Sequence, residues 1–143
     1  KILDKYDKML SHVISDSLVT GAVTIIISGN KPDISKIRNL EKRNIFIDGR
    51  LHDLGKEISS NLVPLISTDW RSSFEWDGIG IIPKTELDLL KKIIERAHFE
   101  NKSIRFWGSP DNERAWRVMS SLGVDLINTD QVYNYIDFNE NNN

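Results

Sequence analysis

The 143-residue sequence contains no cysteine, which excludes disulfide bonds, a thiolate metal site and a cysteine nucleophile. It lacks an apolar run of about 18 residues, so we expect no transmembrane helix. It also lacks an excess of positive charge, because the formal net charge is −2 and no basic tail is present. We therefore expect no nucleic-acid partner. A soluble protein is predicted, and the sequence leaves its compartment open, export included.

Motifs of common catalytic and metal sites are also missing. There is no GxGxxG, no Walker loop, no GxSxG and no HExxH or HxxH pair, and no histidine lies within a carboxylate cluster. His12 and His98 fall on helical patterns and are expected on the surface. His52 follows a predicted strand and is the remaining histidine near a strand end. The motifs therefore assign no catalytic residue and no metal ligand.

What the sequence does contain is a regular alternation of strand and helix patterns. Five apolar runs, each followed by turn residues, predict strands at 22–28, 45–48, 64–67, 103–107 and 124–128. Helical patterns occupy 2–13, 33–43, 51–61, 85–99 and 109–123. Alternating elements predict βαβ units and a parallel sheet. We expect a single α/β domain over residues 1–138 and a disordered polar tail at 139–143.

Cap residues place the ends of the two clearest helices. Thr85 is a plausible N-cap for the helix at 85–99, and Ser109 with Pro110 fits the start of the helix at 109–123. Gly123 fits the end of the second helix.

Polar side chains follow the predicted strands, where function gathers in parallel sheets. The period of two places Asp48 and Arg50 on one face, and Arg105 and Trp107 on one face of another strand. Asn128 and Asp130 share a face at the last strand. Guanidinium groups beside amides and carboxylates suit an oxyanion such as phosphate. The candidate mouth comprises Asp48, Arg50, Arg105, Trp107, Asn128 and Asp130.

A structural role competes with this interpretation. An aspartate at a strand end often caps a helix or forms a turn, and an Asp–Arg pair is often structural. Arg105 is harder to explain locally because it lies inside a strand pattern. The long loop 69–84 carries Trp70, Phe74 and Trp76, which would form a substrate lid, a lipid-facing surface or packing against the sheet.

The strand-end stretches resemble a known family. VTIIISGNKP, IFIDGR, PLISTDW, IRFWGSPD and LGVDLINTD, in this order, resemble the C-terminal half of the phospholipase-C-like phosphodiesterases. The most similar group contains the glycerophosphodiester phosphodiesterases and the altered-inheritance-of-mitochondria protein 6-like proteins. The resemblance covers about residues 20 to 138.

The resemblance implies a TIM (β/α)8 barrel that acts on phosphodiesters with two histidines and a divalent cation, Ca²⁺ or Mg²⁺. The family motifs that carry those histidines and most metal ligands, HRG or HNDY followed by ExD, are absent here. Position by position, the resemblance implies phosphate contact for Arg50 and Arg105 and a pocket wall for Trp107. It implies orientation by hydrogen bonds for Asp48, Asn128 and Asp130.

Four or five βα units cannot close a barrel, which needs eight strands and about 250 residues. We expect the missing N-terminal half to come from the same protein or from another chain. Pairing with a second copy of this chain is an alternative. An open flavodoxin-like parallel sheet is the alternative fold.

The expected function is part of a phosphoric diester hydrolase acting on a small glycerophosphodiester- or phosphoinositide-like substrate, with the chain alone inactive. A non-catalytic phosphate-binding module and a domain that contacts a membrane through the Trp70–Trp76 loop are the alternatives.

Overall fold

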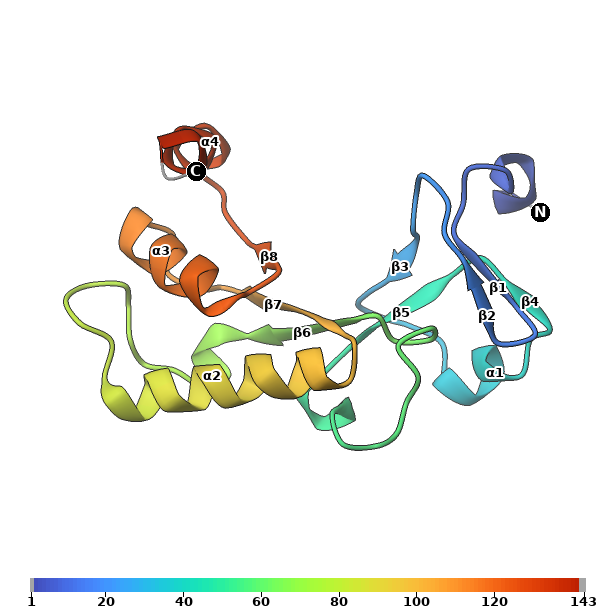
Figure 1. The fold of residues 1–143 in the computed structure, drawn as a ribbon, viewed down its shortest axis with the longest axis horizontal. Coiled ribbons are helices and arrows are strands. Elements are labelled where there is room, and N and C mark those ends of the chain that lie inside the picture. Colours follow the sequence, from blue (N-terminus) through green and yellow to red (C-terminus); the bar gives the residue numbers. More distant parts are fainter. Residues whose placement is uncertain (1, 142–143) are drawn as a thin grey trace. The chain divides into compact units, whose positions relative to one another are not determined.

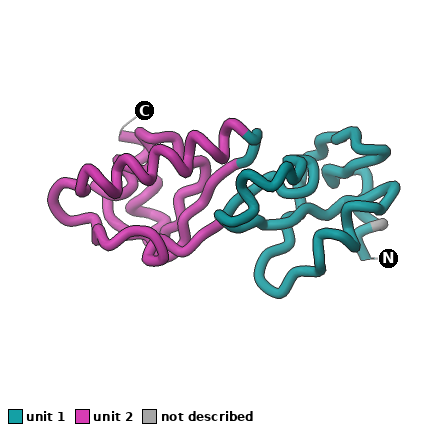
Figure 2. Tube along the Cα trace, turned by 90° about the horizontal axis from the view of Figure 1, so that it is seen from below, with its two compact units in different colours: residues 1–66, 100–102 teal, residues 67–99, 103–143 magenta. Residues whose placement is uncertain are grey.

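The computed structural model describes residues 2–141, apart from the side chain of Asp4. The chain divides into two compact units (Figure 2). Unit 1 comprises residues 1–66 and 100–102, and unit 2 comprises residues 67–99 and 103–143. The expected single domain over 1–138 stays a prediction.

Unit 1 begins with the 3-10 turn η1 (Leu3–Tyr6) and a small antiparallel sheet in the order β2-β1-β4. Strands β1 (His12–Ile14) and β2 (Ser17–Val19) are joined by a two-residue turn. Ser15 and Asp16 adopt positive φ angles of 48° and 64° there, as this hairpin turn requires. The helix predicted at 2–13 is therefore wrong.

The parallel part of unit 1 contains β3 (Ile26–Ile27), α1 (Ile34–Arg38), β5 (Phe46–Gly49) and the start of β6 (Leu65–Asp69). The helix predicted at 33–43 is only α1, because β4 (Lys42–Arg43) pairs with β1.

The helix predicted at 51–61 is also wrong. Only the 3-10 turn η2 (Leu51–Asp53) forms, because Gly55 and Glu57 take left-handed φ angles of 84° and 54°. After this loop Leu62 and Val63 are buried, and the Leu62 carbonyl accepts the Ile47 N–H at 2.9 Å.

Unit 2 follows the predicted alternation closely. After β6 come the 3-10 turn η3 (Trp70–Ser72), α2 (Lys84–Phe99), β7 (Ser103–Trp107), α3 (Glu113–Leu122), β8 (Leu126–Ile127) and α4 (Val132–Asn141). Leu90, Ile94 and Ala97 lie on one face of α2 and are buried in the core.

The predicted caps are partly corrected. Helix α2 begins before Thr85, and α3 is capped by Asn112, whose Oδ1 accepts the Ala115 N–H at 3.1 Å. Ser109 therefore does not cap α3. Gly123 ends α3 with a φ of 89°, as predicted. Residues 139–141 form the last turn of α4 instead of a disordered tail, and residues 142–143 lie outside the described part of the chain.

The five strands of the larger sheet neighbour one another in chain order, β3-β5-β6-β7-β8 (Figure 1). The fold is therefore α/β with a five-stranded parallel sheet. A flavodoxin-like sheet has the order 2-1-3-4-5, with a reversal after the second strand. The alternative of a flavodoxin-like sheet does not fit this order.

The aromatic residues of the 69–84 loop belong to the core of unit 2. Trp70, Phe74 and Trp76 are all buried, and the Trp70 ring lies 4.3 Å from Phe74 and 5.6 Å from Phe106 between centroids. The Trp70 Nε1–H donates to the Trp76 carbonyl at 3.0 Å. The loop therefore packs onto β7.

Asp111 joins the loop after β7 to the loop after β8. Its carboxylate accepts the Trp116 Nε1–H and the Asp130 N–H, each at 2.9 Å. Burial alone raises the pKa of Asp111, but hydrogen bonds from Thr129, Asp130 and Trp116 outweigh it and hold the pKa below its ordinary value.

We expect Asp111→Asn to lower the thermal stability at neutral pH, because the amide replaces one acceptor oxygen by a donor. A carboxyl group with a lowered folded pKa stabilises the fold above its unfolded pKa of 3.8 and loses this contribution as the pH falls through the folded value. The difference in thermal stability between the wild type and the variant should therefore become smaller below about pH 4.

Circular dichroism melts from about pH 7 to about pH 3 measure this difference. The control is Asp88→Asn on the exposed face of α2. If the wild type were more stable than the variant by the same amount at every pH, the lowered pKa of Asp111 would be contradicted.

Candidate anion-binding site

Asp48, near the end of β5, organises the polar cluster of unit 1. Its side chain is 1% exposed, and burial of a carboxylate is costly unless it is paired. The Ser28 hydroxyl donates to Asp48 Oδ2 at 2.5 Å, and Arg50 Nη1 lies 3.1 Å from the same oxygen. The buried carboxylate thereby fixes the residue after β3 and the residue after β5.

Two cations meet at the main chain of this residue. Lys31 Nζ donates to the Asp48 carbonyl oxygen at 2.5 Å, and Arg50 Nη1 lies 3.4 Å from that oxygen and 2.9 Å from the Gly49 carbonyl. Burial, followed by the Arg50 guanidinium, lowers the pKa of Lys31 below its ordinary value. An anion in contact with both groups would offset their repulsion.

Two carboxylates of the cluster, Asp48 and Asp53, are buried. Asp53 is buried, and its Oδ2 accepts the Arg50 N–H at 2.8 Å. Asp48 is also buried, whereas the side chain of Arg50 is 33% exposed. The two buried carboxylates therefore hold Arg50 in place, while Arg50 and the exposed carboxylate of Asp33 reach the hollow.

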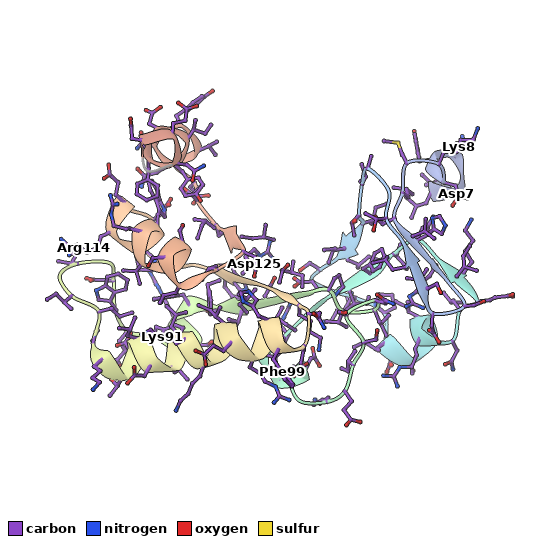
Figure 3. The ribbon with its side chains drawn as sticks, in the orientation of Figure 1. Asp7, Lys8, Lys91, Phe99, Arg114 and Asp125 are labelled. Atoms are coloured by element: carbon purple, nitrogen blue, oxygen red, sulfur yellow. The ribbon has the colours of Figure 1, made fainter. Side chains whose placement is uncertain are left out.

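An open hollow of about 350 Å³ lies over this cluster. His52 lines it with a 70% exposed side chain, and its Nε2 is 3.5 Å from Asp53 Oδ1. His12 instead lies in β1, and His98 Nε2 lies 2.9 Å from Asp125, which Figure 3 labels. The lining residues are Lys31, Pro32, Asp33, Ile34, Arg50, His52 and Asp53.

Arg105 occupies the middle of β7 in unit 2. Burial alternates along this strand, with Ile104 and Phe106 buried, so Arg105 and Trp107 lie on the opposite face. The Arg105 Nε–H donates to the hydroxyl of Ser67, which is fully buried, at 3.1 Å. The guanidinium is thus half-buried and hydrogen-bonded.

The remaining predicted site residues are exposed. Trp107 is 44% exposed, and Asn128 and Asp130 are exposed after β8. The structure brings Asp48 and Arg50 together as predicted from their spacing. That all six residues share one mouth stays a prediction.

Sequence reasoning missed Ser28 and Lys31. Both belong to the SGNKP stretch after β3, so the polar strand end was a usable signal for Ser28. Lys31 carries no such signal, because its contact with a main-chain carbonyl depends on the pairing of β3 with β5.

The cluster does not suit a cation. Within residues 2–141, no group of three or more His, Asp or Glu side chains is arranged to hold a metal ion. The Asp48 carboxylate contacts a guanidinium and a hydroxyl, and an ammonium group lies beside it. These residues fit an anion better than a divalent metal.

We expect Asp48→Asn to lower the free energy of unfolding by about 1–3 kcal/mol, because it removes the buried charge that pairs with Arg50. Urea denaturation measures the change. Asp130→Asn, on an exposed side chain, is the matched control and should alter stability by no more than about 0.5 kcal/mol. Equal effects of the two substitutions would contradict a structural role for the Asp48 pair.

Comparison with known proteins identifies similar chains. The model of the glycerophosphoryl diester phosphodiesterase family matches residues 103–133, from β7 to the start of α4. The altered inheritance of mitochondria protein 6 homolog of Arthroderma benhamiae is 29% identical over 126 residues, which cover 82% of this chain and 40% of that protein. The resemblance predicted from the strand-end stretches is thereby confirmed.

Two further relatives are named altered inheritance of mitochondria protein 6. The protein from Eremothecium gossypii is 24% identical over 139 residues, with 80% of this chain and 34% of that protein covered. The protein from Candida glabrata is 25% identical over 137 residues, with 80% and 33% covered. This chain thus spans 33% to 40% of the length of these curated relatives. No solved structure matches the chain significantly.

Proposed function

We propose that this chain is the phosphate-binding C-terminal part of a phosphoric diester hydrolase with a barrel fold. The observation that carries the proposal is the meeting of Lys31 and Arg50 at one carbonyl oxygen, that of Asp48, beside an open hollow. An ammonium and a guanidinium in this position bind the anionic oxygens of a phosphodiester. The match of residues 103–133 to a phosphodiesterase family supports the same chemistry.

The N-terminal half of such a barrel would complete the sheet, from the same protein or from another chain. The sequential strand order supports this, because a barrel adds each strand beside the one before it. The greater length of the relatives leaves room for further strands. Uncovered edges of a parallel sheet are otherwise an aggregation hazard.

The residues of this chain bind and orient the substrate in the proposed reaction. Lys31 and Arg50 contact phosphate oxygens, and Ser28 with Asp48 fixes the guanidinium. Arg105 is proposed as a phosphate-contacting group of unit 2, with Trp107 as a wall for the substrate. Asn128 and Asp130 are proposed to orient it by hydrogen bonds.

Proton transfer is proposed to lie outside this chain. His52 is the histidine that lines the hollow within the described residues, and a metal-assisted acid–base mechanism of this class uses two. Among residues 2–141, no set of side chains fits the divalent cation, Ca²⁺ or Mg²⁺, that the family resemblance implies. We therefore assign no step to it.

The double substitution Lys31→Gln and Arg50→Gln tests the phosphate role. It should weaken binding of bis(p-nitrophenyl) phosphate at least about tenfold, since each charge-assisted hydrogen bond contributes about 1.5–3 kcal/mol. Binding is measured by NMR titration, with circular dichroism as the check of folding. Lys36→Gln, an exposed lysine of α1, is the control. Unchanged binding by the folded double variant would refute the proposal.

The same diester also tests where catalysis occurs. We expect the chain alone to release no p-nitrophenol with Ca²⁺ or Mg²⁺ present. Release above the buffer rate would contradict the placement of the catalytic groups outside this chain.

Contact with a lipid surface is a second candidate function, favoured by two isoleucines between η3 and α2. Trp70 and Trp76, for which a lipid-facing surface was one of three alternatives, are buried, whereas Ile79 is 75% and Ile81 90% exposed. The Trp76 Nε1–H donates to the Ile79 carbonyl at 2.9 Å. Arg114, labelled in Figure 3, donates to the Gly80 carbonyl at 3.3 Å.

These hydrogen bonds fix the backbone of the loop, and both isoleucine side chains are exposed to solvent. We propose that the two isoleucine side chains insert into a bilayer surface. None of the described helices is long and apolar enough to span a membrane.

We expect Ile79→Ser with Ile81→Ser to reduce co-sedimentation with phosphatidylcholine–phosphatidylserine vesicles at least about tenfold, because burial of one isoleucine contributes about 1.5–3 kcal/mol. Leu89→Ser, on the exposed face of α2, is the control. Equal co-sedimentation of wild type and double variant would exclude this surface.

A further inference from the structure

A second hollow lies next to the anion-binding hollow of unit 1. It encloses about 570 Å³, and Ile34 and Asp53 line both hollows. Its walls come from α1 and from the loop after η2. The lining residues are Ile34, Ser35, Arg38, Asn39, Asp53, Lys56 and Ile58.

The charged side chains that reach this second hollow are cationic. Arg38, the last residue of α1, and Lys56, in the loop after η2, are both exposed. The acidic side chain in the lining, Asp53, is buried and accepts the Arg50 N–H at 2.8 Å.

Arg38 and Lys56 differ from the first pair of cations in what holds them. Lys31 and Arg50 are bound to carbonyl oxygens, whereas within residues 2–141 neither the Arg38 nor the Lys56 side chain forms a hydrogen bond or ion pair. An anion that enters the second hollow would displace no internal partner of these two side chains.

We propose that the second hollow binds another anionic group of the same substrate, so that the preferred phosphodiester carries a phosphate or carboxylate on its alcohol. The inference rests on the proposed function. The two hollows are adjacent along α1, and one helical turn between Ile34 and Arg38 corresponds to about 5–6 Å. A small polyol phosphodiester with one further phosphate spans this distance. A diester with a cationic alcohol such as choline is disfavoured by like charge.

Two diesters that differ by one phosphate test the proposal: glycerophosphoinositol and glycerophosphoinositol 4-phosphate. Isothermal titration calorimetry of the whole chain should show at least about fivefold tighter binding of the phosphorylated diester, because two exposed ion pairs contribute about 1 kcal/mol together. The double variant Arg38→Gln with Lys56→Gln should lose this preference and still bind glycerophosphoinositol as wild type does. Lys36→Gln with Lys91→Gln is the charge-matched control and should keep the preference.

The outcomes separate this inference from the proposed function. Equal binding of both diesters by wild type, or a preference that survives in the Arg38 and Lys56 variant, overturns the second subsite alone. Binding of neither diester overturns the second subsite and the proposed phosphate site together. Loss of the preference in the control variant would mean a general charge effect and also overturns the subsite.

Discussion

The burial of one carboxylate determines the geometry of the candidate site. Asp48 is 1% exposed, so its charge must be compensated from within, and Ser28 and Arg50 do this from the ends of two neighbouring strands. The carbonyl oxygen of the same residue holds Lys31. A structural role and a binding role for Arg50 are therefore compatible, because the pairing that satisfies Asp48 also presents the guanidinium to the hollow.

The sequence predicts those parts of the fold whose patterns are long or strongly periodic. Helix α2 was predictable because Leu90, Ile94 and Ala97 repeat on one face, and all three are buried. Two of the errors fall where residues other than glycine adopt left-handed conformations. Asp16 turns β1 into β2, and Glu57 lies in the segment 51–61 where a helix was expected. The presence of an aspartate or a glutamate in a sequence does not by itself predict a left-handed backbone conformation.

The candidate site was predictable only within one strand. Asp48 lies in β5 and Arg50 directly follows it, so the period of two predicts that both side chains point to the same face. Lys31 reaches the site through the pairing of β3 with β5, which no local pattern encodes. The aromatic residues of the 69–84 loop show the same limit, because composition alone does not determine whether Trp70 faces lipid or Phe106.

A net charge of −2 does not argue against anion binding here, because the charges of unit 1 are layered. Asp53 accepts a main-chain N–H, and Asp48 accepts a hydroxyl and pairs with a guanidinium, so both are buried and hydrogen-bonded. The charged side chains that meet solvent over the hollows are then Lys31, Arg50, Arg38 and Lys56, beside one exposed carboxylate, that of Asp33. Screening limits this local field to about 8–10 Å at physiological salt. A small ligand bound within the hollows would lie inside this distance. The net charge of the chain is therefore compatible with the proposed binding of a small phosphodiester.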